Sequence, residues 1–409
     1  MAGFERDEVS RRRFPALDPE PPPPPWWRRL LVPVCVLAGV ALVVSAVRWL
    51  PSVFAGSPGR PAAAGRPGHR RPAAPAVRAG GRVVFVTQSG ELAVANPDGS
   101  HLARASGLGV VGTALGASPD NRYLSLVNGQ VISVRPGPML ASYPAKVPLS
   151  SNATVALPDP FAGHERFVVR LLDYGDPGQS ASNPISVISV ATGHSVSLGT
   201  GDQVAGDPAA EGVFAALAAP PQASATVLTG NPDARVVLRD AGRPQVVLAT
   251  AGALSHAVGL ARSVPVSLAV YPAPSGAEVA VTVQPAAGGS DGGLVILSRS
   301  GRIVKRLPAR GLAGPALGAP VWSGSGRALA YLSALSGGTP ALTVWSGGGR
   351  ILIHPLPSSA GRYGTCVWSP DGRSVLCPAA GGSEWVVVPE AGGAPAVARG
   401  SGSPVAWLR

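Results

Sequence analysis

The sequence predicts an all-β fold for residues 82–409, built from similar units of short strands. One observation is compositional: 53 Gly and 44 Pro among 409 residues accompany a hydrophobic fraction of 45%. The many Gly and Pro residues fit frequent turns, and the high hydrophobic fraction argues against disorder. Many short β-segments separated by turns account for both values. The other observation is a recurring pattern in which a tight turn separates two short apolar segments, seen most clearly in VWSPDGRSVLC at 367–377.

Within this stretch the sequence predicts two strands joined by a four-residue turn, SPDG. Residues 367–368 end the first strand, and residues 374–377 begin the second. Pro370 sets φ at the first central position of the turn, and Asp371 can bind nearby backbone. Gly372 can take positive φ without a clash from a Cβ atom.

Less regular copies of the pattern occur upstream, at 117–127, 271–283 and 321–332. The last three turns start near Pro274, Gly324 and Pro370, at intervals of 50 and 46 residues. A period of this size with several short strands is typical of a propeller blade. The WSPDGR core resembles the TolB-type and WD-repeat-like β-propeller families, and the resemblance extends over about residues 82–409. It implies protein–protein contact or envelope scaffolding.

The β region divides into seven units, at about 82–105, 110–145, 153–198, 203–250, 265–308, 318–356 and 363–399. The first unit has three strands of its own, and the last residues, 403–409, form one more strand. We therefore predict a seven-bladed β-propeller in which Val405–Leu408 pairs beside Val83–Thr87, because such closure removes exposed sheet edges. Six or eight blades are the alternatives, since the unit at 110–150 is weak.

The N-terminal segment predicts a membrane anchor. Residues 30–47 form an uncharged run of 18 residues, which as a helix spans about 27 Å, close to the bilayer core. We expect a transmembrane helix over 30–50. A cleavable signal peptide ending at VFA, 53–55, is the alternative.

The flanking segments give this anchor an orientation. A Pro/Arg-rich tail at 1–29 carries more arginine than the segment after the helix, which predicts a cytoplasmic N-terminus and an extracytoplasmic propeller. A Pro/Ala/Arg-rich linker at 51–81 is predicted to be disordered. The Arg-, Ala-, Gly- and Pro-rich composition is typical of a GC-rich, actinobacterial-type genome.

The net charge of +12 does not indicate nucleic-acid binding. Residues 1–79 hold 12 Arg and 5 acids, and residues 80–409 hold 22 Lys and Arg and 17 acids, so most of the excess lies in the tail and linker. No basic stripe with interleaved aromatic residues is present. The expected partners are the membrane, through residues 30–50, and a protein or cell-envelope component, with no nucleic acid.

The chain has three cysteines, and Cys35 lies in the apolar run. If Ser369 faces Ser374 across the hairpin, Cys366 directly faces Cys377, and opposed Cβ atoms are close enough for a disulfide. A disulfide that closes this short loop would stabilise the fold by about 2–3 kcal/mol. Two buried free thiols are the alternative, since a one-residue slip would place them on opposite faces.

No catalytic, cofactor-binding or metal-binding residue is predicted. The G-x-S-x-G match at 288–292 is followed by a strand-like segment, whereas a nucleophile elbow needs a helix there. Asp173 and Asp176 match no calcium-loop spacing. The predicted function is a non-catalytic binding or scaffold module, not an enzyme. The alternatives are a transmembrane sensor that signals through the tail, and a propeller hydrolase or lyase with an unrecognised site.

Overall fold

The computed structural model describes most of the chain between residues 79 and 408. The described ranges are 79–104, 114–118, 123–126, 131–134, 140–143, 161–163, 166–170, 184–189, 191–201, 203–210, 212–217, 234–285, 292–307, 319–335, 338–357, 363–379, 384–400 and 402–408. They are nearly all β-structure: the strands form seven four-stranded sheets in these ranges, and the one helix there is α2 (Ala251–Ala257).

Each sheet is a chain of antiparallel neighbours. From the centre outward, the first sheet contains β28 (Ser403–Leu408), β1 (Arg82–Val86), β2 (Leu92–Ala95) and β3 (Ala103–Arg104). The second contains β4 (Ala114–Ala117), β5 (Tyr123–Leu126), β6 (Val131–Val134) and β7 (Leu140–Tyr143). The third contains β8 (Phe161–Ala162), β9 (Arg166–Arg170), β10 (Pro184–Ser189) and β11 (Ser195–Thr200).

The remaining four sheets follow the chain without crossovers. The fourth contains β12 (Gln203–Gly206), β13 (Gly212–Leu217), β14 (Arg235–Asp240) and β15 (Val246–Thr250). The fifth contains β16 (Val266–Pro272), β17 (Glu278–Pro285), β18 (Gly293–Ser298) and β19 (Ile303–Leu307). The sixth contains β20 (Val321–Trp322), β21 (Ala328–Ala334), β22 (Pro340–Ser346) and β23 (Ile351–Pro355). The seventh contains β24 (Val367–Trp368), β25 (Ser374–Pro378), β26 (Glu384–Pro389) and β27 (Ala396–Arg399).

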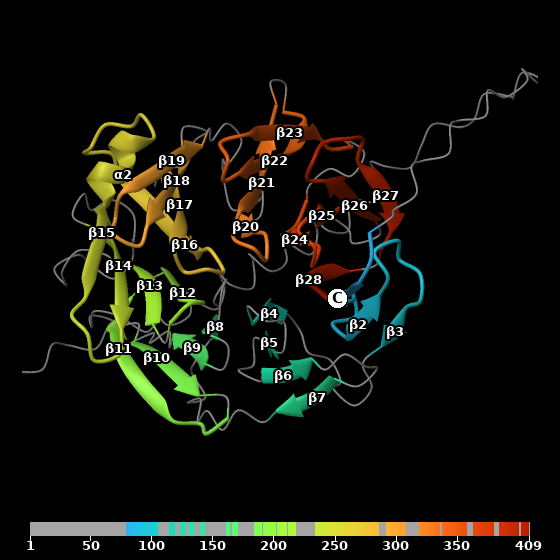
Figure 1. Ribbon diagram of the computed structural model, residues 1–409, viewed down its shortest axis with the longest axis horizontal. Helices are drawn as coiled ribbons and strands as arrows, with labels where there is room; N and C mark the ends of the chain where they lie inside the picture. Colours follow the sequence, from blue (N-terminus) through green and yellow to red (C-terminus); the bar gives the residue numbers. More distant parts are fainter. Residues whose placement is uncertain are drawn as a thin grey trace, which may run out of the picture. The chain divides into compact units, whose positions relative to one another are not determined.

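The sheets are arranged in a propeller-like manner. Figure 1 shows them around a common centre, with the first strand of each sheet nearest to it. Contacts between these innermost strands join neighbouring sheets: β28 contacts β4 and β24, β12 contacts β8 and β16, and β20 contacts β24.

The central residues of the middle strands are mostly apolar because both faces of these strands are covered there. In β18 (GLVILS) and β22 (PALTVWS) five consecutive residues are buried. The hydrophobic core is therefore divided into layers between sheets. One layer contains Phe214, Val281 and Val295 between the fourth and fifth sheets, with Leu254 of α2 packed against it.

The described ends of the β region lie in the same sheet. β28 pairs antiparallel with β1, with Val83 opposite Trp407 and Val84 opposite Ala406. The indole nitrogen of Trp407 also donates to the carbonyl oxygen of Gly80, at 3.0 Å. The pairing is the one that the sequence predicted, because the leftover apolar strand completes a sheet that would otherwise have three strands.

The predicted turn register is confirmed. Val367 lies opposite Leu376 and Trp368 opposite Val375, which is the register of the hairpin predicted around the SPDG turn. Helix α2, in contrast, was not predicted. Thr250 caps its N-terminus, where the side-chain oxygen accepts from the backbone N–H of Ala253 at 3.3 Å.

Several sequence predictions fall on residues outside the described ranges. They are the tail at 1–29, the transmembrane helix at 30–50, nearly all of the linker at 51–81, the acidic pair Asp173 and Asp176, and all but the last residue of the G-x-S-x-G match. No helix in the described part of the chain is long and apolar enough to span a membrane.

Candidate interaction surface

The inner turns, which join the first and second strands of a sheet, repeat one geometry in the fourth to seventh sheets. These turns are residues 207–212, 273–278, 323–328 and 369–374. In the last of them, the N–H of Ser369 donates to the carbonyl of Ser374 at 2.8 Å, and the N–H of Gly372 donates to the carbonyl of Ser369 at 2.9 Å. Equivalent bonds occur in the other three turns. The turn at 207–212 is therefore a further copy of the repeat, although its sequence does not match the SPDG pattern.

Side chains complete the SPDG turn. The hydroxyl of Ser369 donates to Oδ1 of Asp371 at 2.6 Å, and the same hydroxyl oxygen accepts the N–H of Ser374 at 2.9 Å. The bond from Ser369 holds the pKa of the Asp371 carboxyl below its usual value. Asp371 thus serves the turn, as the sequence analysis expected.

Inner turns of neighbouring sheets pack against each other. Gly276 has φ of +64°, and a Cβ atom there would lie 2.4 Å from Cβ of Ala209 and 2.7 Å from Oδ1 of Asp207. Glycine is therefore required both by the backbone conformation and by the approach of the preceding turn. Farther along the chain, Gly326 and Gly372 similarly lie next to the inner turn of the preceding sheet.

The outer turns, which join the third and fourth strands, are bonded to the inner turns of the same sheet. The N–H of Arg299 donates to Ala277 at 2.9 Å, and the N–H of Glu390 donates to the carbonyl of Arg373 at 2.8 Å. The sixth sheet has the equivalent bond from Gly347 to Arg327. Inner and outer turns thus form one surface on the same side of these sheets, which we call the turn face.

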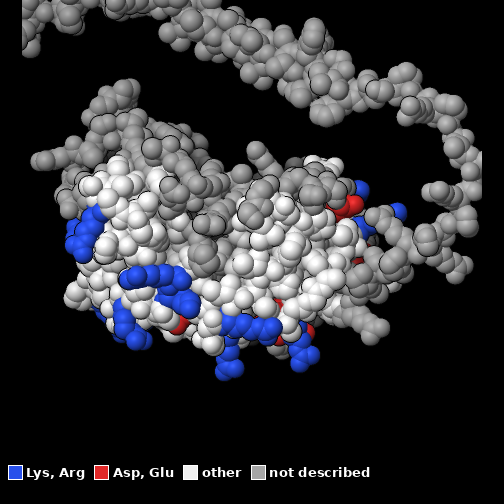
Figure 2. Space-filling model, turned by 90° about the horizontal axis from the view of Figure 1, so that it is seen from above, with Lys and Arg blue, Asp and Glu red and all other residues white. Residues whose placement is uncertain are grey.

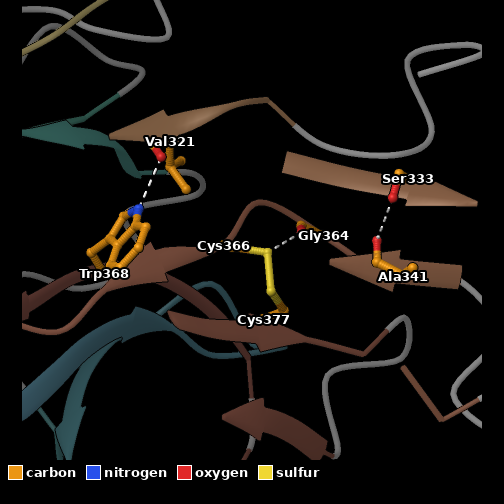
Figure 3. The surroundings of a disulfide bond; sticks show 7 residues. All are labelled: Val321, Ser333, Ala341, Gly364, Cys366, Trp368 and Cys377. Atoms are coloured by element: carbon orange, nitrogen blue, oxygen red, sulfur yellow. Dashed lines mark hydrogen bonds between the residues drawn. A yellow bond between two sulfur atoms is a disulfide. The ribbon is translucent and has the colours of Figure 1, made fainter. Parts of the chain in front are cut away.

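Two tryptophans join the innermost strands of adjacent sheets. The indole Nε1 of Trp322 donates to the carbonyl of Tyr271 at 2.8 Å, and Nε1 of Trp368 donates to the carbonyl of Val321 at 2.9 Å. Figure 3 shows the second bond, which crosses from β24 to β20. Because innermost strands have neighbours on both sides, these bonds fix the spacing of the sheets near the centre.

A buried ion pair links the fourth and fifth sheets. Asp207 is fully buried, and its Oδ2 contacts Nη1 of Arg299 at 2.5 Å. Nη2 of Arg299 also lies 3.6 Å from Oδ2 of Asp240. Burial raises the pKa of the Asp207 carboxyl, although the hydrogen bonds from Ala209 and Arg299 oppose this shift. The turn face is therefore anchored across this sheet boundary by a charged contact.

Exposed arginines extend from the turn face. In the sixth and seventh sheets they are Arg327, Arg350 and Arg373, and the charge of Arg373 helps to lower the pKa of the neighbouring Asp371 carboxyl. The side chains of these arginines have no ion pair or hydrogen bond within the described part of the chain. The backbone beneath them is fixed by the bonds between inner and outer turns. Guanidinium groups on a rigid backbone suit recognition of carboxylate or phosphate groups.

The predicted disulfide lies at the other end of the β24–β25 hairpin from the SPDG turn. Cys366 and Cys377 are bonded, with Cα atoms 4.2 Å apart, and both residues are buried (Figure 3). The pair joins the segment that enters β24 to the second strand of the same sheet. Its burial favours a structural role over a redox role.

No catalytic constellation is evident within the described ranges. No group of three or more His, Cys, Asp or Glu residues there could hold a metal ion. His354 is buried on β23, and burial lowers its pKa. Its Nε2 has no hydrogen-bond partner in the described part, and a hydrogen bond with the backbone of Gly393 opposes the lowering of the pKa.

No protein-family model matches the sequence, and no curated protein sequence matches it significantly. Solved structures give matches of low identity. Hydrazine synthase from Kuenenia stuttgartiensis is 14% identical, with 70% of this chain and 80% of that chain covered and a TM-score of 0.43. TolB from Acinetobacter baumannii is 13% identical, with 80% of this chain and 66% of that chain covered and a TM-score of 0.42. An oligogalacturonate lyase in complex with manganese is 12% identical, with 75% of this chain and 81% of that chain covered and a TM-score of 0.46.

Proposed function

We propose that the chain is a membrane-anchored, extracytoplasmic β-propeller of seven blades that acts as a non-catalytic binding or scaffold module. Each four-stranded sheet is one blade in this proposal, and the pairing of β28 with β1 closes the ring. A ring without free ends gives a rigid platform, because every blade is supported from two sides. The uncharged run at 30–47 supplies the anchor.

The binding role is supported mainly by one feature of the turn face: its backbone is fixed by hydrogen bonds, whereas charged side chains on it are left without partners in the described ranges. The turns are held by repeated hydrogen bonds, whereas Arg327 and Arg350 remain exposed and unpaired within the described ranges. A surface that is already ordered loses little conformational entropy when it binds. The partner proposed for it is a protein or envelope component that presents acidic groups.

The test uses the full chain in its native membrane. After in-membrane crosslinking and extraction in two mild detergents, the wild-type protein should appear in a complex larger than its 41.0 kDa chain. The variant R327E/R350E should lose this complex while keeping the wild-type melting temperature, because both side chains are exposed. A monomer in both detergents and after crosslinking would refute the proposal.

A further inference from the structure

We propose that the outer hairpins β14–β15 and β18–β19 dock the domain against an anionic lipid surface. The inference rests on the membrane anchoring proposed above, and it adds which edge of the domain faces the lipid. We call this surface the basic edge. Its exposed members are Arg243, Val246, Val247, Arg302, Ile303 and Arg306.

Basic residues are unevenly distributed among the outer hairpins. Residues 234–250 and 293–307 contain seven basic residues and one acid, Asp240; the basic residues are Arg235, Arg239, Arg243, Arg299, Arg302, Lys305 and Arg306. The outer hairpin at 384–399 contains two acids and one arginine, and the hairpin at 340–355 contains one arginine. Among these outer hairpins, the basic residues are therefore concentrated on β14–β15 and β18–β19. Figure 2 shows Lys and Arg side chains gathered along one side of the domain, with few acidic side chains among them.

The two hairpins form one continuous surface. A Cβ atom on Gly301 would lie 2.4 Å from the carbonyl oxygen of Leu248, so the turn before β19 directly contacts β15. Arg299 in the same turn reaches across to Asp207 and Asp240 of the neighbouring sheet. The basic edge is thus held rigidly, and its exposed side chains project from a fixed backbone.

Exposed aliphatic side chains lie among these charges. Val246 and Val247 are each 46% exposed and Ile303 is 37% exposed, and these are half of the six large exposed hydrophobic residues in the described part. Arg243 precedes the valines and Arg302 precedes the isoleucine. Aliphatic groups beside arginines match a lipid surface, where the former enter the headgroup region and the latter contact phosphates.

The proposed membrane anchor and the linker that follows it favour lipid over a soluble acidic protein as the partner of the basic edge. A segment of the length of residues 51–81 spans at most about 110 Å even when fully extended. The domain therefore stays near the bilayer, and even a weak surface contact is populated because its effective concentration is high. Each basic residue close to an anionic surface is worth about a fivefold change in the ratio of docked to undocked molecules.

The test places an environment-sensitive fluorophore on the basic edge of the full chain. In a Cys35→Ala background the disulfide leaves no other free thiol, so a label at Val247→Cys is specific. Nanodiscs contain either phosphatidylcholine alone or phosphatidylcholine with 40% phosphatidylglycerol. We expect a blue shift and quenching by doxyl lipid only in the anionic discs. A label at Val397→Cys is the matched control, because Val397 is 42% exposed on the outer strand β27, in a hairpin that carries two acids.

A charge variant tests the cause of docking. Arg302 and Arg306 are exposed and have no side-chain partner in the described ranges, so R302E/R306E should keep the wild-type melting temperature. It should lower the docked-to-undocked ratio at least 25-fold, and 0.5 M salt should act in the same direction. Equal emission from the Val247 label in both kinds of disc, or shielding only on addition of another protein, would overturn the proposal. Resistance to carbonate extraction, measured in parallel, separates this failure from failure of the anchor itself.

Discussion

Replacing Arg299 with methionine should destabilise the β domain because it leaves a buried carboxylate without its cation. Asp207 is fully buried, and Arg299 supplies its ion pair. Removing one partner of a buried pair costs about 3–5 kcal/mol. We expect the lower end, about 3 kcal/mol, because the Arg299 side chain is 34% exposed and water can partly replace it.

The same turn provides a matched control. Arg302 is exposed and has no side-chain partner in the described part, so R302M should change stability by less than about 0.5 kcal/mol. The double variant D207N/R299M should recover at least half of the loss, because an amide needs no counterion and its oxygen can still accept the N–H of Ala209.

The measurement is the thermal unfolding midpoint of the full chain in detergent. For a domain of this size, each kcal/mol corresponds to about 2 °C, so R299M should melt about 6 °C below the wild type. If R299M and R302M melt within about 1 °C of each other, the ion pair does not support the fold and the reasoning fails.

Three further results are expected. In urea unfolding, W368F should lower the free energy of unfolding by about 1–3 kcal/mol more than W345F does. The Trp368 indole donates a hydrogen bond, whereas Nε1 of Trp345 has no partner within the described ranges. Equal losses in the two variants would contradict this. Burial raises the pKa of the Asp207 carboxyl in the folded protein, so ionising this carboxyl costs stability. The free energy of unfolding of the wild type should therefore fall, relative to that of D207N, as the pH rises through the pKa of Asp207 in the folded protein. Parallel stability–pH profiles for the two proteins would exclude this effect. C366S/C377S should lower stability by about 2–3 kcal/mol, and intact mass should show two fewer free thiols in the wild type before reduction than after; an unchanged count would disprove the bond.

Much of the strand pattern could be predicted because each unit encodes its own turns. The unit expected at 203–250 coincides with β12 to β15, and the unit expected at 265–308 contains β16 to β19. Local signals are sufficient here: a turn needs Pro, Asp and Gly at fixed positions, and the strands beside it are apolar. The turn at 207–212 was overlooked because Asp207 replaces the serine and alanines replace the Asp and Gly of the motif.

The contacts that hold the sheets together could not be predicted in this way. Asp207 and Arg299 are 92 residues apart, and no spacing rule relates them. The indole bond from Trp368 to Val321 likewise depends on the packing of separate sheets. The basic edge was missed because charge was counted along the chain, whereas its arginines come together only when two outer hairpins meet. Helix α2 is too short for its periodicity to be read from sequence.

The central claim is that the ring is closed by β28 lying against β1, and a cysteine crosslink tests it most directly. Val84 lies opposite Ala406, so V84C/A406C in the Cys35→Ala background should form a new disulfide under mild oxidation. V83C/A406C is offset by one residue and places the thiols on opposite faces of the sheet. We predict efficient crosslinking of the first pair and little of the second. Absence of a crosslink in V84C/A406C, or equal yields from both pairs, would contradict closure.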